Sequence, residues 1–307
     1  MKPKYDKPAL TPGEQAELLF SRGLKGIETD ELIKTLSFVS YYRLRGYMYP
    51  YQDNSIPSTP FLNGTSWEYI KNDYLFDQQF RHLIFSAVEN IEIAMRTQLT
   101  LQMSLTYGSR WYTDKKLFVK ENLWAKDREN LQKEWQRSKE VFTGHYNSCY
   151  DTTYDPPSWM IFETASFGTL SKYFENIDYT LPARNRITGF WGFPEKSGIV
   201  VSSWFRHLSF VRNICAHYGR LFSRELIVTP VFPKYPPEKW VSKWYNPNRV
   251  YTTVCILTCL LDYCAPDYDF RTMLSGLMHT IRSEQLPAMG FPENWQQEPL
   301  FKGEHTI

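Results

Sequence analysis

The chain has 307 residues, a hydrophobic fraction of 42% and a net charge of +2. A chain of this length can bury a core without disulfide bonds, and its small net charge excludes a protein whose whole surface attracts polyanions. A nucleic-acid site would therefore have to be local. The longest uncharged apolar stretch, 250–261, is shorter than the roughly 20 residues that a membrane-spanning helix needs, so we expect no membrane segment.

The first 51 residues contain neither a secretory signal pattern nor a lipidation motif, which predicts a cytoplasmic protein. The cysteines form no CxxC pair, and their number is odd, which argues against a disulfide framework and a zinc site. We expect buried, reduced thiols, with no metal and no cofactor. The cysteines are Cys149, Cys215, Cys255, Cys259 and Cys264.

Helical spacing of apolar residues dominates the N-terminal third. A first helix is predicted to begin at the Thr11-Pro12-Gly-Glu14 capping signal and to end at Gly23. A second begins near Thr29 and leads into the aromatic segment 40–51. The stretch 66–107 contains neither proline nor glycine but exceeds the usual helix length, so it predicts two helices with a break near Asp77.

The rest of the chain continues the helical pattern. We expect helices at 120–142 and 197–218, a polar loop at 144–157, and an ordered aromatic loop or small ribbon in the proline-rich segment 228–247. Two further helices, 248–264 and 267–283, complete the core. Because alternating strand patterns are nearly absent, the fold class is all-α. We divide it into an N-terminal helical extension, 1–64, and a helical domain, 65–307, within one continuous globular unit.

One short segment concentrates positive charge. Residues 206–225 contain four arginines and a single acid, and Arg212, Asn213 and His217 lie within six residues. Residues five apart on a helix are separated by about 140°, so Arg212 and His217 converge only if the helix bends or ends there. Asn213 and His217, four apart, share a face. The seating face of this helix is predicted to be Leu208, Val211, Ile214 and Cys215.

These residue types suit phosphate chemistry. The guanidinium of Arg212 can donate a fork of hydrogen bonds to phosphate oxygens, and His217 can transfer a proton near neutral pH. RNA can be cleaved without a metal because its own 2′-hydroxyl can attack the adjacent phosphate. A structural interpretation remains open, in which Arg212 pairs with a neighbouring acid and His217 is hydrogen-bonded at a helix end.

Several blocks along the chain resemble the Abi-like (Abi-D/Abi-F) abortive-infection proteins of bacteria. The resemblance extends from about residue 7 to residue 225. Its blocks are KPALTPGEQAELLFSRGL, SYYRLRGYMYPY, YLFDQQFRHLIFSAVENIEIAMRT, YGSRWY, PPSWMIFETASFGTLSKYF and VRNICAHYGRLFSRE.

That family resembles a branch of the HEPN superfamily of helical ribonucleases, whose R-x4-6-H motif is matched by Arg212 and His217. The resemblance implies an HEPN-like helical bundle with a proline-rich and aromatic insertion. It also implies a metal-independent endoribonuclease of phage defence, toxin-like when unrestrained, with Arg212, Asn213 and His217 as catalytic residues. HEPN sites combine two motifs, and this chain has one, so a homodimer is expected. RNA is the implied substrate and, as a small structured RNA, a candidate regulator.

Most of the further residues receive two interpretations. Arg220 and Arg224 could extend an RNA surface or be solvated charges at a helix end, and Arg206 is assigned to the same RNA surface. Arg43 and Arg45, among five tyrosines in 40–51, could bind RNA, or that aromatic segment could serve packing. The supporting residues Glu92 and Arg96, four apart, form either an ion pair or a second layer of one cleft, and Glu163 is either a paired structural carboxylate or part of that site.

Two other functional classes remain open from the sequence. One is a protein that binds RNA without cutting it, because the paired geometry of the motif is lost. The other is a helical interaction module whose basic cluster is an assembly surface.

Overall fold

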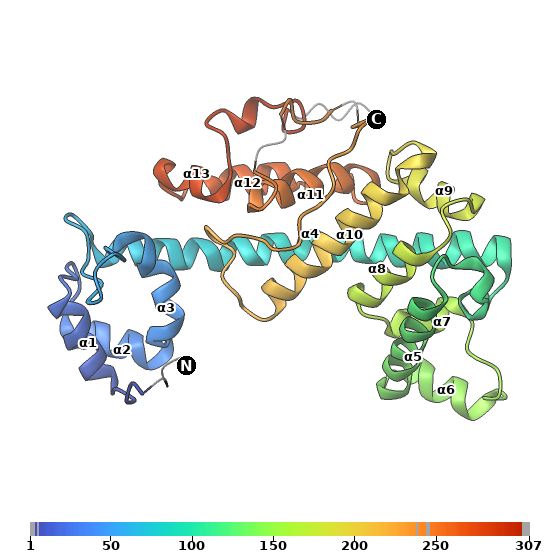
Figure 1. The fold of residues 1–307 in the computed structure, drawn as a ribbon, viewed down its shortest axis with the longest axis horizontal. Coiled ribbons are helices and arrows are strands. Elements are labelled where there is room, and N and C mark those ends of the chain that lie inside the picture. Colours follow the sequence, from blue (N-terminus) through green and yellow to red (C-terminus); the bar gives the residue numbers. More distant parts are fainter. Residues whose placement is uncertain (1–3, 5, 238, 244–245, 303–307) are drawn as a thin grey trace. The chain divides into compact units, whose positions relative to one another are not determined.

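The computed structural model describes residues 4, 6–237, 239–243 and 246–302 (Figure 1). In these residues the regular structure consists of helices and two isolated β-bridges, without a strand, which confirms the all-α prediction. Short 3-10 turns join several of the α-helices. The α-helices are α1 (Pro12–Ser21), α2 (Thr29–Phe38), α3 (Tyr41–Met48), α4 (Trp67–Tyr107), α5 (Glu121–Arg137), α6 (Val141–Cys149), α7 (Ser158–Ile161), α8 (Phe167–Asn176), α9 (Pro182–Phe190), α10 (Gly198–Ala216), α11 (Val250–Cys264), α12 (Phe270–Met278) and α13 (Leu286–Met289).

The chain forms two compact units, 1–79 and 80–307. The division falls within the long helix α4, after Gln79. The extension boundary that we place from the sequence between residues 64 and 65 stays a prediction.

Helix α1 in the first unit begins as the sequence predicts. The Thr11 hydroxyl accepts a hydrogen bond from the Glu14 N–H at 3.3 Å, and the Glu14 carboxylate accepts one from the Thr11 N–H at 2.7 Å. Pro12 occupies the first helical position, where its missing N–H costs nothing. Gly23 follows the helix with φ +91°, a conformation that favours glycine. The capping box and the stop are both confirmed.

Helix α4 runs unbroken from Trp67 to Tyr107, so the predicted break near Asp77 is wrong. Asp77 is fully buried and its carboxylate accepts a hydrogen bond of 2.5 Å from the Tyr47 hydroxyl. One turn earlier on α4, Asp73 accepts a hydrogen bond of 2.6 Å from Tyr51. Both carboxylates thus accept hydrogen bonds from tyrosines of the aromatic segment 40–51, and the helix continues through Asp77 without a break.

The second unit is built around α10. Helix α10 packs against α8, α9 and α11 (Figure 1). Its predicted seating face is confirmed, since Leu208, Val211, Ile214 and Cys215 are all buried. On α4, the residues that continue its apolar stripe through this unit, Ile84, Val88, Ile91 and Met95, are also fully buried.

Helix α6 occupies residues predicted as the end of one helix and the start of a loop. The expected helix 120–142 is instead divided into α5 and α6, with extended backbone at Ser138 and Glu140 between them. The side chain of Tyr146 is buried on α6 and packs edge-on against Trp135 of α5 at 5.8 Å. This aromatic contact gives residues 141–149 an apolar face, so the loop begins only after Cys149.

The described part of the proline-rich segment is held against α10 by hydrogen bonds and a ring contact. The Trp204 indole donates a hydrogen bond to the Val231 carbonyl at 3.0 Å, and the Val231 N–H donates one to the Ser203 hydroxyl at 2.9 Å. Trp240 stacks on Trp204 at 5.2 Å. Residues 238, 244 and 245 lie outside the described residues. The described residues of this segment form a loop without strand structure.

The five cysteines are free thiols, as expected. Cys215, Cys255 and Cys259 are buried and Cys264 is half-buried, but Cys149 at the end of α6 is exposed, so the expectation of burial is wrong there. Among the helices of the described residues, none combines the length and the apolar character that a membrane crossing requires.

The Tyr47–Asp77 contact yields a stability prediction. Replacing Tyr47 with phenylalanine removes a hydrogen bond to a fully buried carboxylate, so the free energy of unfolding should fall by about 2 kcal/mol. Urea unfolding followed by circular dichroism measures the loss. Tyr49→Phe is the control, because the Tyr49 side chain is 57% exposed and should change stability little. Equal stabilities for the two variants would contradict the assigned role of the Tyr47 hydroxyl.

Candidate functional site

Helix α10 ends at the segment that the sequence singles out. His217 is the C-terminal cap, the Tyr218 N–H donates to the Cys215 carbonyl at 3.0 Å, and the Gly219 N–H donates to the Ile214 carbonyl at 2.8 Å. These two bonds form a Schellman motif, which satisfies the last helical carbonyls. The helix ends at His217, which is one of the two conditions under which Arg212 and His217 could converge, but His217 does not line the cleft that Arg212 lines, so their convergence stays a prediction.

In the turn after His217, the residue with the left-handed backbone conformation is not the glycine. The left-handed position, where glycine is usual, is occupied by Tyr218 with φ +56°, which costs about 1–2 kcal/mol for a residue with a side chain. Glycine instead follows at 219, where a Cβ atom would lie 3.1 Å from Ile214 Cγ2 and 3.3 Å from the Ile214 carbonyl oxygen. A close approach to the helix therefore requires Gly219, and the Tyr218 ring is left two-thirds exposed beside the motif.

Asn213 and His217, which share a face through their four-residue spacing, are both exposed at this end of α10. Their backbones are joined by the helical hydrogen bond from the His217 N–H to the Asn213 carbonyl, at 3.0 Å. In the described part of the chain, neither the His217 imidazole nor the Asn213 amide has a side-chain hydrogen bond. Both polar groups therefore remain able to bind a ligand.

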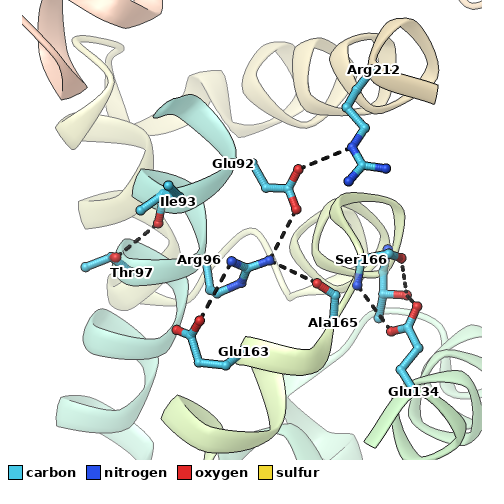
Figure 2. A network of polar contacts seen from close by, with 10 residues as sticks. Glu92, Ile93, Arg96, Thr97, Glu134, Glu163, Ala165, Ser166 and Arg212 are labelled. Atoms are coloured by element: carbon cyan, nitrogen blue, oxygen red, sulfur yellow. Dashed lines mark hydrogen bonds and ion pairs between the residues drawn. The ribbon is translucent and has the colours of Figure 1, made fainter. Parts of the chain in front are cut away.

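Arg212 lies against α4 (Figure 2). Its Nε atom is 3.7 Å from Glu92 Oε2, and its guanidinium sits over the Phe85 ring at 5.5 Å. The side chain is 34% exposed. Among the described residues, Nη1 and Nη2 of Arg212 have no hydrogen-bond partner. The arginine is thus oriented through one nitrogen and one ring face while its two terminal amino groups stay available to a ligand.

Glu92 joins Arg212 to a second arginine (Figure 2). Arg96 Nη2 is 3.2 Å from Glu92 Oε1 and donates a hydrogen bond of 3.0 Å to the Ala165 carbonyl. Arg96 Nη1 is 3.8 Å from Glu163 Oε2, and Glu163 is 54% exposed. Glu92 and Arg96 therefore form the i,i+4 ion pair and line one cleft with Arg212, whereas Glu163 reaches this network through Arg96.

The cleft around Arg212 has a volume of about 350 Å³ and mixed charge. Burial raises the pKa of the Glu92 carboxyl above its ordinary value, while the charges of Arg212 and Arg96 act in the opposite direction. The cleft can offer the cationic fork of Arg212 to an anion, but Glu92 compensates part of that charge. It is lined by Phe85, Glu89, Glu92, Ile93, Arg96 and Arg212.

The other predicted arginines lie in different surroundings. Arg206 pairs with Glu175 at 3.4 Å, and both side chains are about half exposed. Arg220 donates to the Phe222 carbonyl at 2.7 Å, and Arg224 donates to the Arg220 carbonyl at 3.4 Å. These last two arginines therefore brace the turn after α10. Arg43 and Arg45 are exposed on α3 in the first unit.

His207 receives no role from the sequence, yet it fixes the helix that carries the motif. It is fully buried, its Nδ1 lies 2.6 Å from the Val228 carbonyl, and its Nε2 lies 2.8 Å from the Thr253 hydroxyl. Burial lowers the pKa of His207 to about 4. The neutral ring donates from Nδ1 to the carbonyl and accepts at Nε2 from the hydroxyl. His207 thus ties α10 to α11 and to the segment that follows the motif.

The sequence prediction also misses Phe85, although its spacing from Glu92 could have identified it. Phe85 and Glu92 lie seven residues apart on α4, which places them on one face of the helix. Each of these two residues directly follows a residue of the buried apolar row, Ile84 and Ile91. No group of three or more histidine, cysteine, aspartate or glutamate side chains that could hold a metal occurs among the described residues.

Comparison with known proteins identifies a family. The family model described as Abi-like protein matches residues 34–223, which is more than half of the chain. Searches of curated proteins and of solved structures gave no match. The chain therefore belongs to the Abi-like family, and this membership suggests a role in abortive infection, that is, in resistance to phage.

The buried His207 predicts a pH dependence of stability. In the unfolded chain a histidine has a pKa near 6.5, whereas the folded value is about 4. Between these pH values the unfolded state binds the proton and the folded state does not. The contribution of His207 to the free energy of unfolding is therefore fully present above pH 6.5, falls as the pH decreases, and levels off below pH 4. Between pH 7 and pH 5 the contribution of His207 to the free energy of unfolding should fall by about 2 kcal/mol.

Urea unfolding at the two pH values, compared between the native chain and His207→Gln, measures this contribution. The glutamine variant should lose that part of the pH dependence. His279→Gln is the control, because His279 is exposed at the end of α12 and its replacement should leave the pH dependence intact. An unchanged pH dependence in His207→Gln would disprove the assignment.

Proposed function

We propose that this chain is a metal-independent endoribonuclease of the HEPN superfamily that acts in abortive infection and cuts RNA at a site shared by two copies. The observation that carries the proposal is the end of α10. There the exposed imidazole of His217 follows Arg212, whose terminal amino groups have no hydrogen-bond partner among the described residues while its Nε is oriented by Glu92. A proton-transfer group and a phosphate-binding fork thus lie five residues apart.

The reaction needs no group beyond the RNA and these side chains. A base removes the proton from a 2′-hydroxyl, and the oxygen attacks the adjacent phosphorus. The bond from phosphorus to the 5′-oxygen breaks, and an acid protonates the departing oxygen. The products are a 2′,3′-cyclic phosphate and a 5′-hydroxyl. We assign proton transfer to His217 and a hydrogen bond to the RNA or within the motif to Asn213.

Arg212 would stabilise the charge that develops on the phosphate. Its Nη1 and Nη2 atoms form the planar pair of donors that matches two phosphate oxygens. Glu92 and Phe85 would hold this pair in place before RNA arrives, so Glu92 acts as a positioning residue. The negative charge of Glu92 weakens the attraction of the cleft for phosphate. The cleft would therefore contribute by orienting Arg212 rather than by a large net positive charge.

A second copy would complete the site. Transesterification uses one group as a base and another as an acid. Each chain supplies a single histidine for these roles at the end of α10, His217. Arg212 lies against α4, whereas Asn213 and His217 are exposed. Two copies facing each other through these exposed groups would bring two imidazoles to one phosphate. We therefore propose a homodimer that works in the cytoplasm.

The first unit offers a surface for more of the RNA. A cleft of about 910 Å³ is lined by Lys7, Arg22 and Arg45 together with Tyr41 and Tyr42, and none of the described residues that line it is acidic. Tyr42 is 82% exposed, so its ring can stack on a base. This combination supports binding of a substrate or of a small regulatory RNA in this unit.

A second candidate function is RNA binding without cleavage. The observation that favours it is the ion pair of Arg212 with Glu92, because an arginine that already has a carboxylate partner is a weaker stabiliser of a phosphate. In that case RNA would bind and remain intact. The two functions differ in a single readout, the cleavage of the bound RNA.

Purified protein incubated with end-labelled RNA in EDTA tests the ribonuclease. The native chain should produce 2′,3′-cyclic phosphate ends. His217→Ala should lower the cleavage rate by a factor of about 10³ while sparing RNA affinity, since it removes the proton-transfer group. Arg212→Ala should lower both the rate and the affinity, the latter about tenfold, since it removes charged hydrogen bonds to phosphate.

Two matched variants control for general damage to the fold. His279→Ala removes an exposed histidine that also caps a helix C-terminus. Arg128→Ala removes an arginine of nearly equal exposure, 33%, that also pairs with a carboxylate, Asp155, at 2.6 Å. Both should cut RNA at the native rate. Equal cleavage by the native chain, His217→Ala and Arg212→Ala would refute the mechanism, and tight binding without cleavage by the native chain would favour the second function.

Mixing tests whether two copies share one site. When equal amounts of native chain and His217→Ala re-equilibrate, only about a quarter of the dimers carry two native histidines. A shared site predicts that activity per total dimer falls to about a quarter, whereas independent sites predict about half. Light scattering should find a dimer, and a monomer that cuts RNA at the native rate would contradict the shared site.

A further inference from the structure

A second cavity, separate from the Arg212 cleft, lies in the unit 80–307. It has a volume of about 550 Å³, which is within the usual range for small-ligand sites. Helices α5, α8, α9 and α10 contribute to its walls, together with Val231 of the proline-rich segment. It shares no lining residue with the cleft around Arg212.

Positive charge surrounds the opening of this cavity. The exposed lining residues include Lys120, Lys126, Lys172 and Arg206, against one exposed acid, Glu175. Glu175 pairs with Arg206, which leaves the three lysines as a net positive group. These lysines come from α5, α8 and the residue before α5, so the fold gathers them at one place. A ligand that enters here should carry negative charge.

Most polar groups in the buried wall are already satisfied. The Asn176 side chain accepts from the Lys120 N–H and donates to the Lys120 carbonyl, both at 2.9 Å. Ser203 accepts from the Val231 N–H at 2.9 Å, and Ser202 accepts from Arg184 at 3.1 Å. These contacts hold the wall in shape without a ligand.

Asp127 is the exception. It lines the cavity and is only 7% exposed, yet its carboxylate has no hydrogen bond or ion pair among the described residues. Burial raises the pKa of Asp127 above its ordinary value, with Lys172 and Lys126 acting in the opposite direction. Nearby, Arg184 is 4% exposed, donates hydrogen bonds to the Ile177 carbonyl and the Ser202 hydroxyl, and lies over the Phe174 ring. In the described chain its Nε atom lacks a hydrogen-bond partner. Among the described residues, a buried carboxylate thus lacks a hydrogen-bond donor beside one cavity.

We propose that this cavity binds a nucleotide. The lysines at the opening would hold the phosphates, and the Asp127 carboxylate would accept hydrogen bonds from the base or from ribose hydroxyls. Tyr179, a lining residue that is 67% exposed, offers a ring for stacking on the base. Inorganic phosphate alone fits less well, because its own negative charge would be repelled by Asp127, whereas a nucleotide places the neutral donors of its base or ribose there.

The nucleotide could be a free molecule or one unit of an RNA chain. The chemistry of recognition is the same for both, so the test must separate them. Arg206 lines the cavity and belongs to α10, the helix whose C-terminal end carries the candidate catalytic residues. Binding at the cavity is nevertheless independent of the proposed ribonuclease, because it is measured without cleavage and with His217 intact.

Calorimetric titration of the full-length protein tests the site. The probes are the four ribonucleoside triphosphates, the four monophosphates, sodium pyrophosphate and a 5′-phosphorylated hexaribonucleotide whose 2′-hydroxyls are methylated to prevent cleavage. At least one nucleotide or the oligonucleotide should bind more tightly than pyrophosphate. Lys172→Glu and Lys126→Glu should weaken this binding at least about tenfold, since each reverses a charge at the opening.

Asp127→Asn separates nucleotide recognition from simple anion binding. This variant keeps the shape of the side chain, so it should weaken nucleotide binding about tenfold and leave pyrophosphate unchanged or tighter. Lys116→Glu is the matched control, because Lys116 is exposed but does not line the cavity. Binding of mononucleotides identifies a free ligand, and binding of the oligonucleotide alone identifies an RNA segment. The proposal fails if no probe binds, if pyrophosphate binds as tightly as every nucleotide, or if Lys116→Glu weakens binding as much as Lys172→Glu.

Discussion

The burial of α10 is the constraint on which the second unit depends. Twelve of its 19 residues are buried, so every polar side chain on its inner faces needs a partner inside the protein. Ser203 satisfies the Val231 backbone, and His207 bridges Val228 and Thr253. These contacts fix α10 within the unit, and the exposed polar groups that remain for a ligand, Asn213 and His217, lie where the helix ends.

Helix α4 supplies the other half of the candidate site through two neighbouring rows of side chains. One row, which includes Ile84 and Ile91, is fully buried. The next, one residue along, includes Phe85 and Glu92 and lines the cleft around Arg212. A shift of one residue turns a helix face by about 100°, which is enough to pass from the core to its border. The candidate site therefore lies on the edge of the core, where a charged pair keeps some contact with solvent.

Local signals in the sequence predict the parts of the fold that depend on neighbouring residues. The capping box of α1, the buried face of α10 and the end of α10 near His217 follow from spacing and residue type alone. Contacts between distant segments do not. Asp77 resembles a helix break until its tyrosine partner is known, and the partner of Arg212 on α4 cannot be chosen among 33 acids by spacing. The catalytic roles, the RNA surface and the homodimer stay predictions.

The turn after α10 has a consequence for how a ligand would be received. Leu221, Phe222 and Leu226 are fully buried, and Arg220 is bonded to a carbonyl of the same turn. The segment beside His217 is therefore already ordered in the folded protein. Preorganisation of this kind leaves little backbone entropy to be lost on association, so discrimination among ligands should depend on shape and hydrogen bonding rather than on induced folding.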